Sequence, residues 1–295
     1  FRVESNRNNI QAGSSFHEDA AMERPSSSTL LLKLASILPL ILPGHIGGAF
    51  ADQPASFQGL GALPGSQFGS LARAISQDGS AVTGNSDQSL DDGSFMMAFR
   101  WQAGVMVPLG DLPGSSELSE SGGISADGSA AAGMSFSVNN TEAFRWVNGV
   151  MQGVGDVAGG PVYSHGFNIS GDGSTVVGLS LDEVGSAAFR WKSGVMIDVL
   201  DDFPGFATGV ARACSHDGNV VVGLFNAEGL SRPFRWESGV VTPINLPPGA
   251  VWGAAMSVST DGATIVGTIT YQPNPSISEG FRWQGGEMTL LGDLP

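Results

Sequence analysis

Histidine most often carries acid–base or metal chemistry near neutral pH, and this chain has four histidines. His17 and His45 lie in a leader described below, ahead of its predicted cleavage site. His165 and His216 fall at different positions of two repeat units, and no two histidines have the spacing of a metal site. We expect His216 to be a surface turn residue. A Ser/His/Asp site assembled from several units stays open at this point.

Acidic residues and the single cysteine offer little further chemistry. Asp91-Asp92 and Asp201-Asp202 predict solvated acidic loops, with calcium binding as the alternative. Cys214 is the one cysteine, so no disulfide forms within the chain, and its place in the repeat predicts a small buried core residue. We therefore predict no catalytic residue, no metal site and no cofactor.

The residues that do recur are an arginine between two aromatic residues. The motif occurs five times, as Phe99-Arg100-Trp101, Phe144-Arg145-Trp146, Phe189-Arg190-Trp191, Phe234-Arg235-Trp236 and Phe281-Arg282-Trp283. Two rings and a guanidinium could form a stacking platform for a sugar or a nucleotide. Five regular copies favour a structural layer instead. Neighbours in a strand point to opposite faces, so Phe and Trp share one face and Arg takes the other.

A second marker, Asp-Gly, keeps nearly the same period. The motif starts are spaced by 45, 45, 45 and 47 residues, and the Asp-Gly pairs by 49, 45, 45 and 44. The aspartates are Asp78, Asp127, Asp172, Asp217 and Asp261. A partly buried arginine needs an acceptor, and this repeated aspartate is the predicted partner, within a unit or in the next one.

Each unit reads as four short strands. Asp-Gly between two apolar runs predicts a hairpin, and Asn148-Gly149 predicts a second hairpin after the Phe-Arg-Trp strand. Four strands in about 45 residues predict one blade of a β-propeller, so we expect an all-β chain with five full blades in residues 52–295. Ser56–Gly65 matches only the last strand and connector of a unit. We therefore expect a propeller that is incomplete at the C-terminus, with further units or an anchor beyond Pro295.

Composition agrees with many short strands and restricts the partners. The chain has 43 Gly and 16 Pro, and 14% of its residues are charged. Residues 1–51 carry four basic and four acidic residues, so the net charge of −15 lies in residues 52–295. Such a surface repels nucleic acid and anionic membranes, and we expect neither as a partner. No segment after the leader is apolar over eighteen residues, so no transmembrane segment is predicted.

Residues 22–51 have the parts of a secretory signal peptide. Arg24 and Lys33 give a positive start, and a short apolar run interrupted by prolines follows. Ala49-Phe50-Ala51 has the small-x-small form of a cleavage site, which predicts cleavage after Ala51. Met22 is the expected start of translation.

The repeated residues resemble the HAF repeat family of bacterial extracellular repeat proteins. Ala-Phe-Arg-Trp is intact in three units, while Pro233 and Gly280 replace Ala in the other two. The family's preceding His is replaced by Met97, Glu142, Ala187, Arg232 and Glu279. The resemblance implies an exported protein, at the cell surface or outside it, in some members as an autotransporter passenger. It implies no enzymatic activity and carries over no catalytic residue.

Two functions of different class follow. The first is a secreted or surface-displayed binding or structural β-propeller without enzymatic activity, whose extracellular ligand or partner is unknown. Trp252 is the one Trp outside Phe-Arg-Trp, so it is the predicted contact residue, with packing between blades as the alternative. The second is an exported propeller hydrolase or lyase acting on a polysaccharide or a lactone, which rests on fold analogy alone.

Overall fold

The computed structural model describes most of the chain after the leader. The described residues are 57–66, 69–90, 93–114, 118–138, 140–201, 203, 208–271 and 278–292. The predicted signal peptide, Asp91, Asp92 and Asp202 lie outside them. None of the described residues belongs to a helix that is long and apolar enough to cross a membrane.

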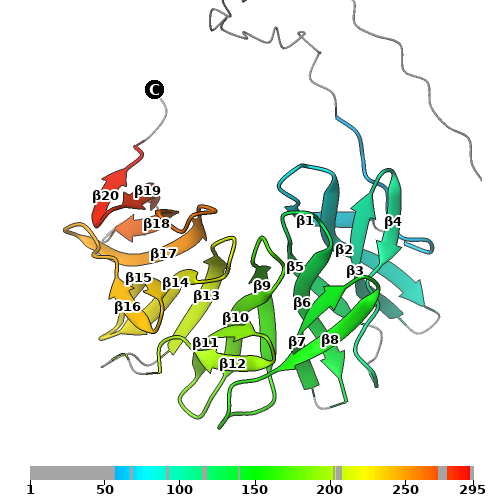
Figure 1. The fold of residues 1–295 in the computed structure, drawn as a ribbon, viewed down its shortest axis with the longest axis horizontal. Coiled ribbons are helices and arrows are strands. Elements are labelled where there is room, and N and C mark those ends of the chain that lie inside the picture. Colours follow the sequence, from blue (N-terminus) through cyan, green and yellow to red (C-terminus); the bar gives the residue numbers. More distant parts are fainter. Residues whose placement is uncertain are drawn as a thin grey trace, which may run out of the picture. The chain divides into compact units, whose positions relative to one another are not determined.

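Twenty β-strands and no helix form the regular structure of the described residues, in five successive groups of four that we call blades 1 to 5 (Figure 1). Blade 1 holds β1 (Ser70–Ile75), β2 (Ala81–Leu90), β3 (Gly93–Gln102) and β4 (Val105–Pro108). Blade 2 holds β5 (Ser119–Ile124), β6 (Ala130–Ser137), β7 (Asn140–Val147) and β8 (Val150–Gly155). Blade 3 holds β9 (Ser164–Ile169), β10 (Thr175–Leu181), β11 (Ser186–Lys192) and β12 (Val195–Asp198). Blade 4 holds β13 (Thr208–Cys214), β14 (Val220–Ala227), β15 (Leu230–Glu237) and β16 (Val240–Pro243). Blade 5 holds β17 (Ala250–Val258), β18 (Thr264–Tyr271), β19 (Ser278–Gln284) and β20 (Glu287–Leu290).

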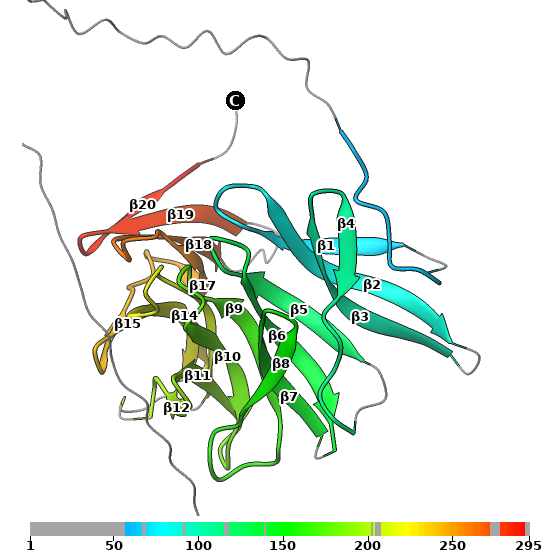
Figure 2. The ribbon, with the colours of Figure 1, turned by 45° about the vertical axis from the view of Figure 1, so that its right-hand side comes forward.

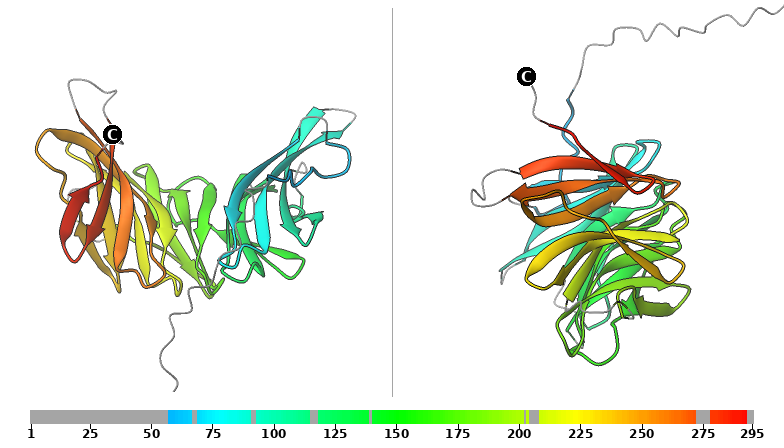
Figure 3. Two further views of the ribbon diagram at one scale, coloured as in Figure 1. Left: turned by 90° about the horizontal axis from the view of Figure 1, so that it is seen from above. Right: turned by 90° about the vertical axis from the view of Figure 1, so that its left-hand side faces the viewer.

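Within each blade the strands pair in chain order and antiparallel, which confirms the predicted four-stranded unit. Blades 4 and 5 also share one parallel bridge, between Ser231 and Trp252. The first strands pack side by side from blade to blade, β1 on β5, β5 on β9, β9 on β13 and β13 on β17. Figures 2 and 3 show the sheets following one another in chain order, from cyan to red. We call these first strands the inner strands.

The Asp-Gly hairpin is held by the aspartate itself. In blade 2 the Asp127 carboxylate accepts the Ser125 hydroxyl at 2.7 Å and the Ser129 N–H at 2.9 Å. The Ser125 hydroxyl oxygen in turn accepts the N–H of Ala130 at 2.9 Å. The hydrogen bonds from Ser129 and Ser125 lower the pKa of Asp127 to about 2. The predicted second hairpin is also present, because Asn148 and Gly149 have φ of 50° and 87°, as a two-residue turn with two left-handed positions requires.

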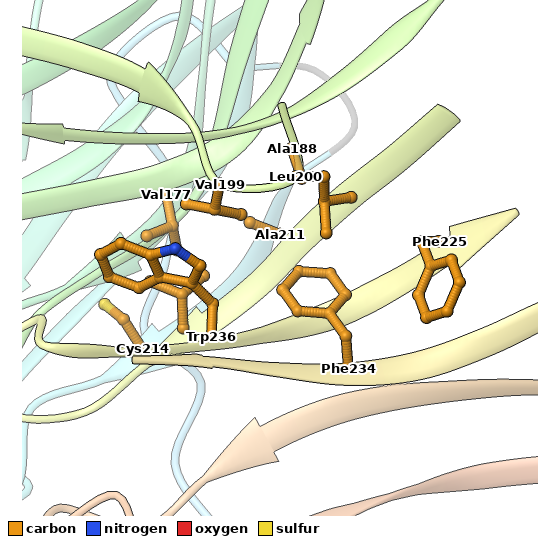
Figure 4. Packing of buried hydrophobic residues seen from close by; sticks show 10 residues of the cluster. Val177, Ala188, Val199, Leu200, Ala211, Cys214, Phe225, Phe234 and Trp236 are labelled. Carbon is orange, nitrogen blue, oxygen red and sulfur yellow. The ribbon is translucent and has the colours of Figure 1, made fainter. Parts of the chain in front are cut away.

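Phe and Trp of the motif face the preceding blade in blades 2 to 5. Phe234 and Trp236 of blade 4 lie in one buried cluster with Val177 of blade 3 and with Leu200 of the connector that follows blade 3 (Figure 4). Clusters of the same kind lie between the other blades. All five Phe side chains of the motif are fully buried. The connectors and the two aromatic rings therefore form the apolar layer between blades.

In blades 1 to 4 the Arg of the motif faces the following blade, and the predicted acceptor was wrong. Arg190 Nε donates to the backbone carbonyl of Gly218 in blade 4 at 2.8 Å, and its Cζ lies 5.4 Å from the Trp236 ring centroid. The Asp217 carboxylate is instead engaged in its own turn, with Ser215 and Asn219. The aspartate thus shapes the turn that presents the carbonyl, and the glycine beside it provides the acceptor.

The same bond recurs from blade to blade. The other donors and acceptors are Arg100 with Gly128, Arg145 with Gly173, and Arg235 with Gly262. Arg282 of blade 5 is exposed and donates to Gln284 on its own strand.

Residues 57–66 bind blade 1 as a connector does. Leu63 is buried against Met97 and Phe99, and its N–H donates to Ser86 Oγ at 3.1 Å. Leu112 donates in the same way to Ser135 Oγ of blade 2. The prediction of a connector at Ser56–Gly65 is confirmed, but the predicted strand is wrong, because residues 57–66 form none.

Candidate functional site

Each inner strand contains a β-bulge, two residues before the last residue of the apolar run. In blade 4, Ala211 pairs with Gly223 and Ala213 with Val222, so Arg212 between them is left unpaired. A bulge bends its strand and redirects the extra side chain. The bulged residues are Arg73, Gly122, Phe167, Arg212 and Met256.

The bulge brings the backbone of the inner strand close to the second strand, which explains why each second strand has a glycine opposite it. A Cβ built on Gly178 would lie 1.9 Å from the backbone oxygen of His165 and 2.8 Å from the Phe189 ring. No larger residue fits there while the inner strand keeps this course. The equivalent glycines are Gly84, Gly133, Gly178, Gly223 and Gly267. The bulge is therefore part of the repeat, whereas the residue that it displays changes from blade to blade.

Blades 3 and 4 bring three of these variable inner-strand side chains together. The His165 and Phe167 rings lie 4.5 Å apart between centroids, on β9. Arg212 on β13 places its Cζ 5.1 Å from the Phe167 ring centroid. A guanidinium over an aromatic face is attracted by the ring and held in a defined plane.

His165 is held neutral in this cluster. Burial lowers its pKa, and the charges of Arg73 and Arg212 lower it further, to about 4. The two charges come from different blades, Arg73 from blade 1, where it is exposed, and Arg212 from blade 4. Blade 2 lies between Arg73 and His165 in the chain, and its bulged residue, Gly122, lies so close to β9 that an added Cβ would fall 2.5 Å from the backbone oxygen of Gly166.

Neither arginine forms an ion pair with another described residue. In the described part of the chain, the single ion pair joins Arg235 to Glu237 at 2.8 Å, both on β15. Arg212 Nε is buried and finds no hydrogen-bond partner among the described residues. A buried donor without an acceptor costs about 1–3 kcal/mol. The site therefore presents positive charge and an unused donor inside a chain of net charge −15.

A hollow of about 280 Å³ lies beside this cluster, at the Asp-Gly end of the inner strands. Its apolar wall is made by Ile75, Ile124, Cys214 and Val258, and its rim by Gln77, Ala126, Gly171, His216 and Thr260. These residues come from all five blades, at equivalent positions of the repeat. Arg73 and Arg212 lie two residues before Ile75 and Cys214 on their strands, which is about 7 Å away.

The residues singled out from the sequence lie elsewhere. Phe-Arg-Trp and the Asp of Asp-Gly lie between blades and in the hairpin turns. Trp252 begins the inner strand of blade 5, outside the cluster, with 36% of its surface exposed, and its role in binding stays a prediction. His216 is exposed in its turn, as predicted. Cys214 is buried, as predicted, and burial raises the pKa of its thiol to about 12.

A second hollow, of about 560 Å³, lies at the outer strands between blades 3 and 4. Asp182, Asp198 and Asp201 line it, and burial raises the pKa of Asp198 to about 6. No group of three metal-ligating side chains occurs among the residues that the structure describes.

The inner-strand cluster was missed from the sequence. His165 was considered only as the histidine that could serve a hydrolase or lyase, and Arg73, Phe167 and Arg212 were not singled out. The sequence holds a signal that could have found the bulged residues: each lies two positions before the last apolar residue ahead of Ser-x-Asp-Gly. The bulge itself, which turns this position toward its neighbours, is not visible in an alternating pattern.

Comparisons with known proteins identify the fold. No model of a known protein family matches the chain, and no curated protein matches it. Among solved structures, a protein assigned as TolB from Agrobacterium tumefaciens is similar with a TM-score of 0.50 and 16% identity, over 76% of this chain and 82% of that one. TolB from Acinetobacter baumannii gives 0.49 and 13%, over 75% of this chain and 54% of that one. The β-propeller domain of the Trilobed protease from Pyrococcus furiosus gives 0.46 and 10%, over 75% and 70%. The chain has the β-propeller fold, as predicted, and at these identities the likeness concerns the fold alone.

The depressed pKa of His165 makes stability depend on pH. The unfolded chain binds a proton at His165 below about pH 6.5, whereas the folded chain binds it only near pH 4. Stability therefore falls as pH drops from 6.5 to 4. In His165→Gln this loss should shrink by on the order of 2 kcal/mol, measured by urea unfolding at pH 7.5 and pH 4.5. NMR of the folded chain should show the His165 ring titrating near pH 4, and a midpoint between pH 6 and 7 contradicts the described cluster.

Proposed function

We propose that this chain is an exported, non-enzymatic β-propeller that binds a ligand at the bulged residues of its inner strands. The observation that carries this proposal is that the packing residues and the variable residues occupy different positions of the repeat. Residues that pack the blades are nearly identical in all five, while the bulged position holds Arg, Gly, Phe, Arg and Met. Packing needs the same chemistry five times, but recognition of one ligand needs different groups at defined places.

The chemistry of the inner cluster suits holding a ligand. Two guanidiniums, an aromatic ring and a neutral imidazole offer charge, donors and a stacking face. Cys214, the one thiol, stays protonated at neutral pH and is a weak nucleophile, because burial raises its pKa to about 12.

Export and membership in the HAF repeat family are parts of the same proposal. They rest on the leader at residues 22–51, on the Ala-Phe-Arg-Trp motif and on the acidic composition of residues 52–295. N-terminal sequencing of chain collected outside the cytoplasm should give a mature start at Asp52. Chain that stays in the cytoplasm and keeps its leader contradicts export.

A hydrolase or lyase acting on a polysaccharide or lactone is the second candidate. One observation favours it: His165 is unprotonated at neutral pH, and the charges of Arg212 and Arg73 that act on it would also stabilise a developing oxyanion. Product formation distinguishes this candidate from simple binding.

The proposed function is tested by a ligand screen with two readouts. Thermal shift and direct binding are measured for neutral sugars, acidic sugars, peptides and lactones, and each hit is incubated with the chain and analysed by mass spectrometry. We expect hits that are lost in the triple variant Arg73→Gln/His165→Asn/Arg212→Gln and are recovered unchanged after incubation. Turnover that His165→Asn abolishes contradicts the non-enzymatic role. Hits that survive the triple variant place the binding site elsewhere.

A further inference from the structure

The inner cluster concentrates positive charge in an acidic protein. Arg73 and Arg212 both act on His165, and neither has an ion-pair partner in the described part of the chain. Arg73 belongs to blade 1 and Arg212 to blade 4. The His165 and Phe167 rings belong to β9 of blade 3, which lies between these two blades in the chain. Arg212 lies over Phe167 beside His165, and the exposed Arg73 adds a second positive charge that acts on His165, so an anion is favoured at this cluster.

The position of Arg212 costs free energy, and its packing contacts do not explain why it lies there. Its Nε is buried without an acceptor, while its guanidinium lies over Phe167. The ring holds the guanidinium over its face, and no hydrogen bond within the described residues engages the donors of Arg212. Guanidinium donors can bind a planar carboxylate through two parallel bonds. A buried donor that has no acceptor and brings no gain in packing is typical of a binding site.

The surrounding charge restricts the size of the anion. Residues 52–295 carry the whole net charge of −15, so a polyanion is repelled before it reaches the inner strands. Glu120 of blade 2 occupies the repeat position that His165 has in blade 3, and it adds one negative charge to the inner strands. A single carboxylate satisfies the arginines with the least repulsion.

We propose that Arg73 and Arg212 bind the carboxylate of a ligand that carries one such group, a small monocarboxylic acid or the C-terminus of a peptide. This inference rests on the proposed binding function and adds the class of ligand. The guanidinium of Arg212, oriented by Phe167, binds the carboxylate, and Arg73 neutralises it from blade 1. The neutral His165 imidazole contributes a hydrogen bond. The apolar part of the ligand lies against Ile75 and Ile124 in the hollow of about 280 Å³.

Binding is tested by calorimetric titration of the full chain with matched acid and amide pairs. The pairs are hippurate with hippuramide, and the peptide N-acetyl-Ala-Ala-Phe with its C-terminal amide. We expect each acid to bind about tenfold or more tightly than its amide, because the amide has no charge to pair with the arginines. A stronger acid preference in the peptide pair identifies a peptide C-terminus as the source, and one in the hippurate pair a small acid.

Variants of equal charge separate the site from a general charge effect. Arg212→Gln and Arg73→Gln should each weaken acid binding by about fivefold or more, with little effect on the amides. Arg232→Gln removes one charge from the same blade as Arg212, on an outer strand, and should leave the affinity within about twofold. Arg212→Met should lose acid binding and keep or raise the melting temperature, because it removes the buried donor.

Three results overturn the carboxylate assignment. The first is equal affinity for acid and amide, and the second is acid binding that Arg73→Gln and Arg212→Gln leave unchanged. The third is that a polyuronate or inorganic phosphate binds more tightly than either acid. Neutral hits that the triple variant loses, with no preference for acids, contradict this inference and leave the proposed function intact. Absence of any hit that depends on the inner cluster contradicts both.

Discussion

The bond from arginine to a glycine carbonyl of the next blade is the interaction on which the rest of the structure depends. A four-stranded blade has two apolar faces and cannot bury either of them alone. Phe and Trp of the motif cover one face of the blade. Arg lies on the other face, where its N–H donors need an acceptor. The Asp-Gly turn of the next blade supplies that acceptor, as Gly218 does for Arg190. Each motif therefore specifies both neighbours of its blade.

This arrangement leaves the bulged position of the inner strand free to vary. The apolar layer between blades is made by the third strand, the second strand, the connector and the buried residues of the inner strand, such as Ala211 and Cys214 in the cluster around Phe234. The bulge leaves one residue of each inner strand out of the pairing pattern. The glycine opposite it on the second strand leaves room for the backbone of the inner strand. The bulged positions can then carry Arg, Gly, Phe or Met while the packing residues stay nearly the same. The variable residue and the residues that pack the blades thus occupy different positions of one repeat.

Much of this fold could be predicted from the sequence, because its determinants are local and repeated. Asp-Gly and Asn148-Gly149 predict hairpins by turn chemistry, and the period predicts the blade. The partner of Arg190 could not be predicted, because charge suggested the aspartate whereas the aspartate is occupied within its own turn. The inner cluster was missed for a similar reason. A bulge changes the direction of one residue, and nothing in an alternating pattern places Arg212 on Phe167 of another blade.

The central claim, that the motif arginine joins adjacent blades, is tested most directly by comparing Arg190→Ala with Arg282→Ala. The two residues occupy the same position of the repeat, but Arg190 donates to Gly218 of the next blade and Arg282 to Gln284 of its own strand. A charged hydrogen bond of about 1.5–3 kcal/mol predicts that Arg190→Ala lowers the melting temperature by about 4 °C or more. Arg282→Ala should stay within about 1 °C of the unmodified chain. Equal effects of the two substitutions contradict the claim, because the arginine would then stabilise its own blade rather than the contact between blades.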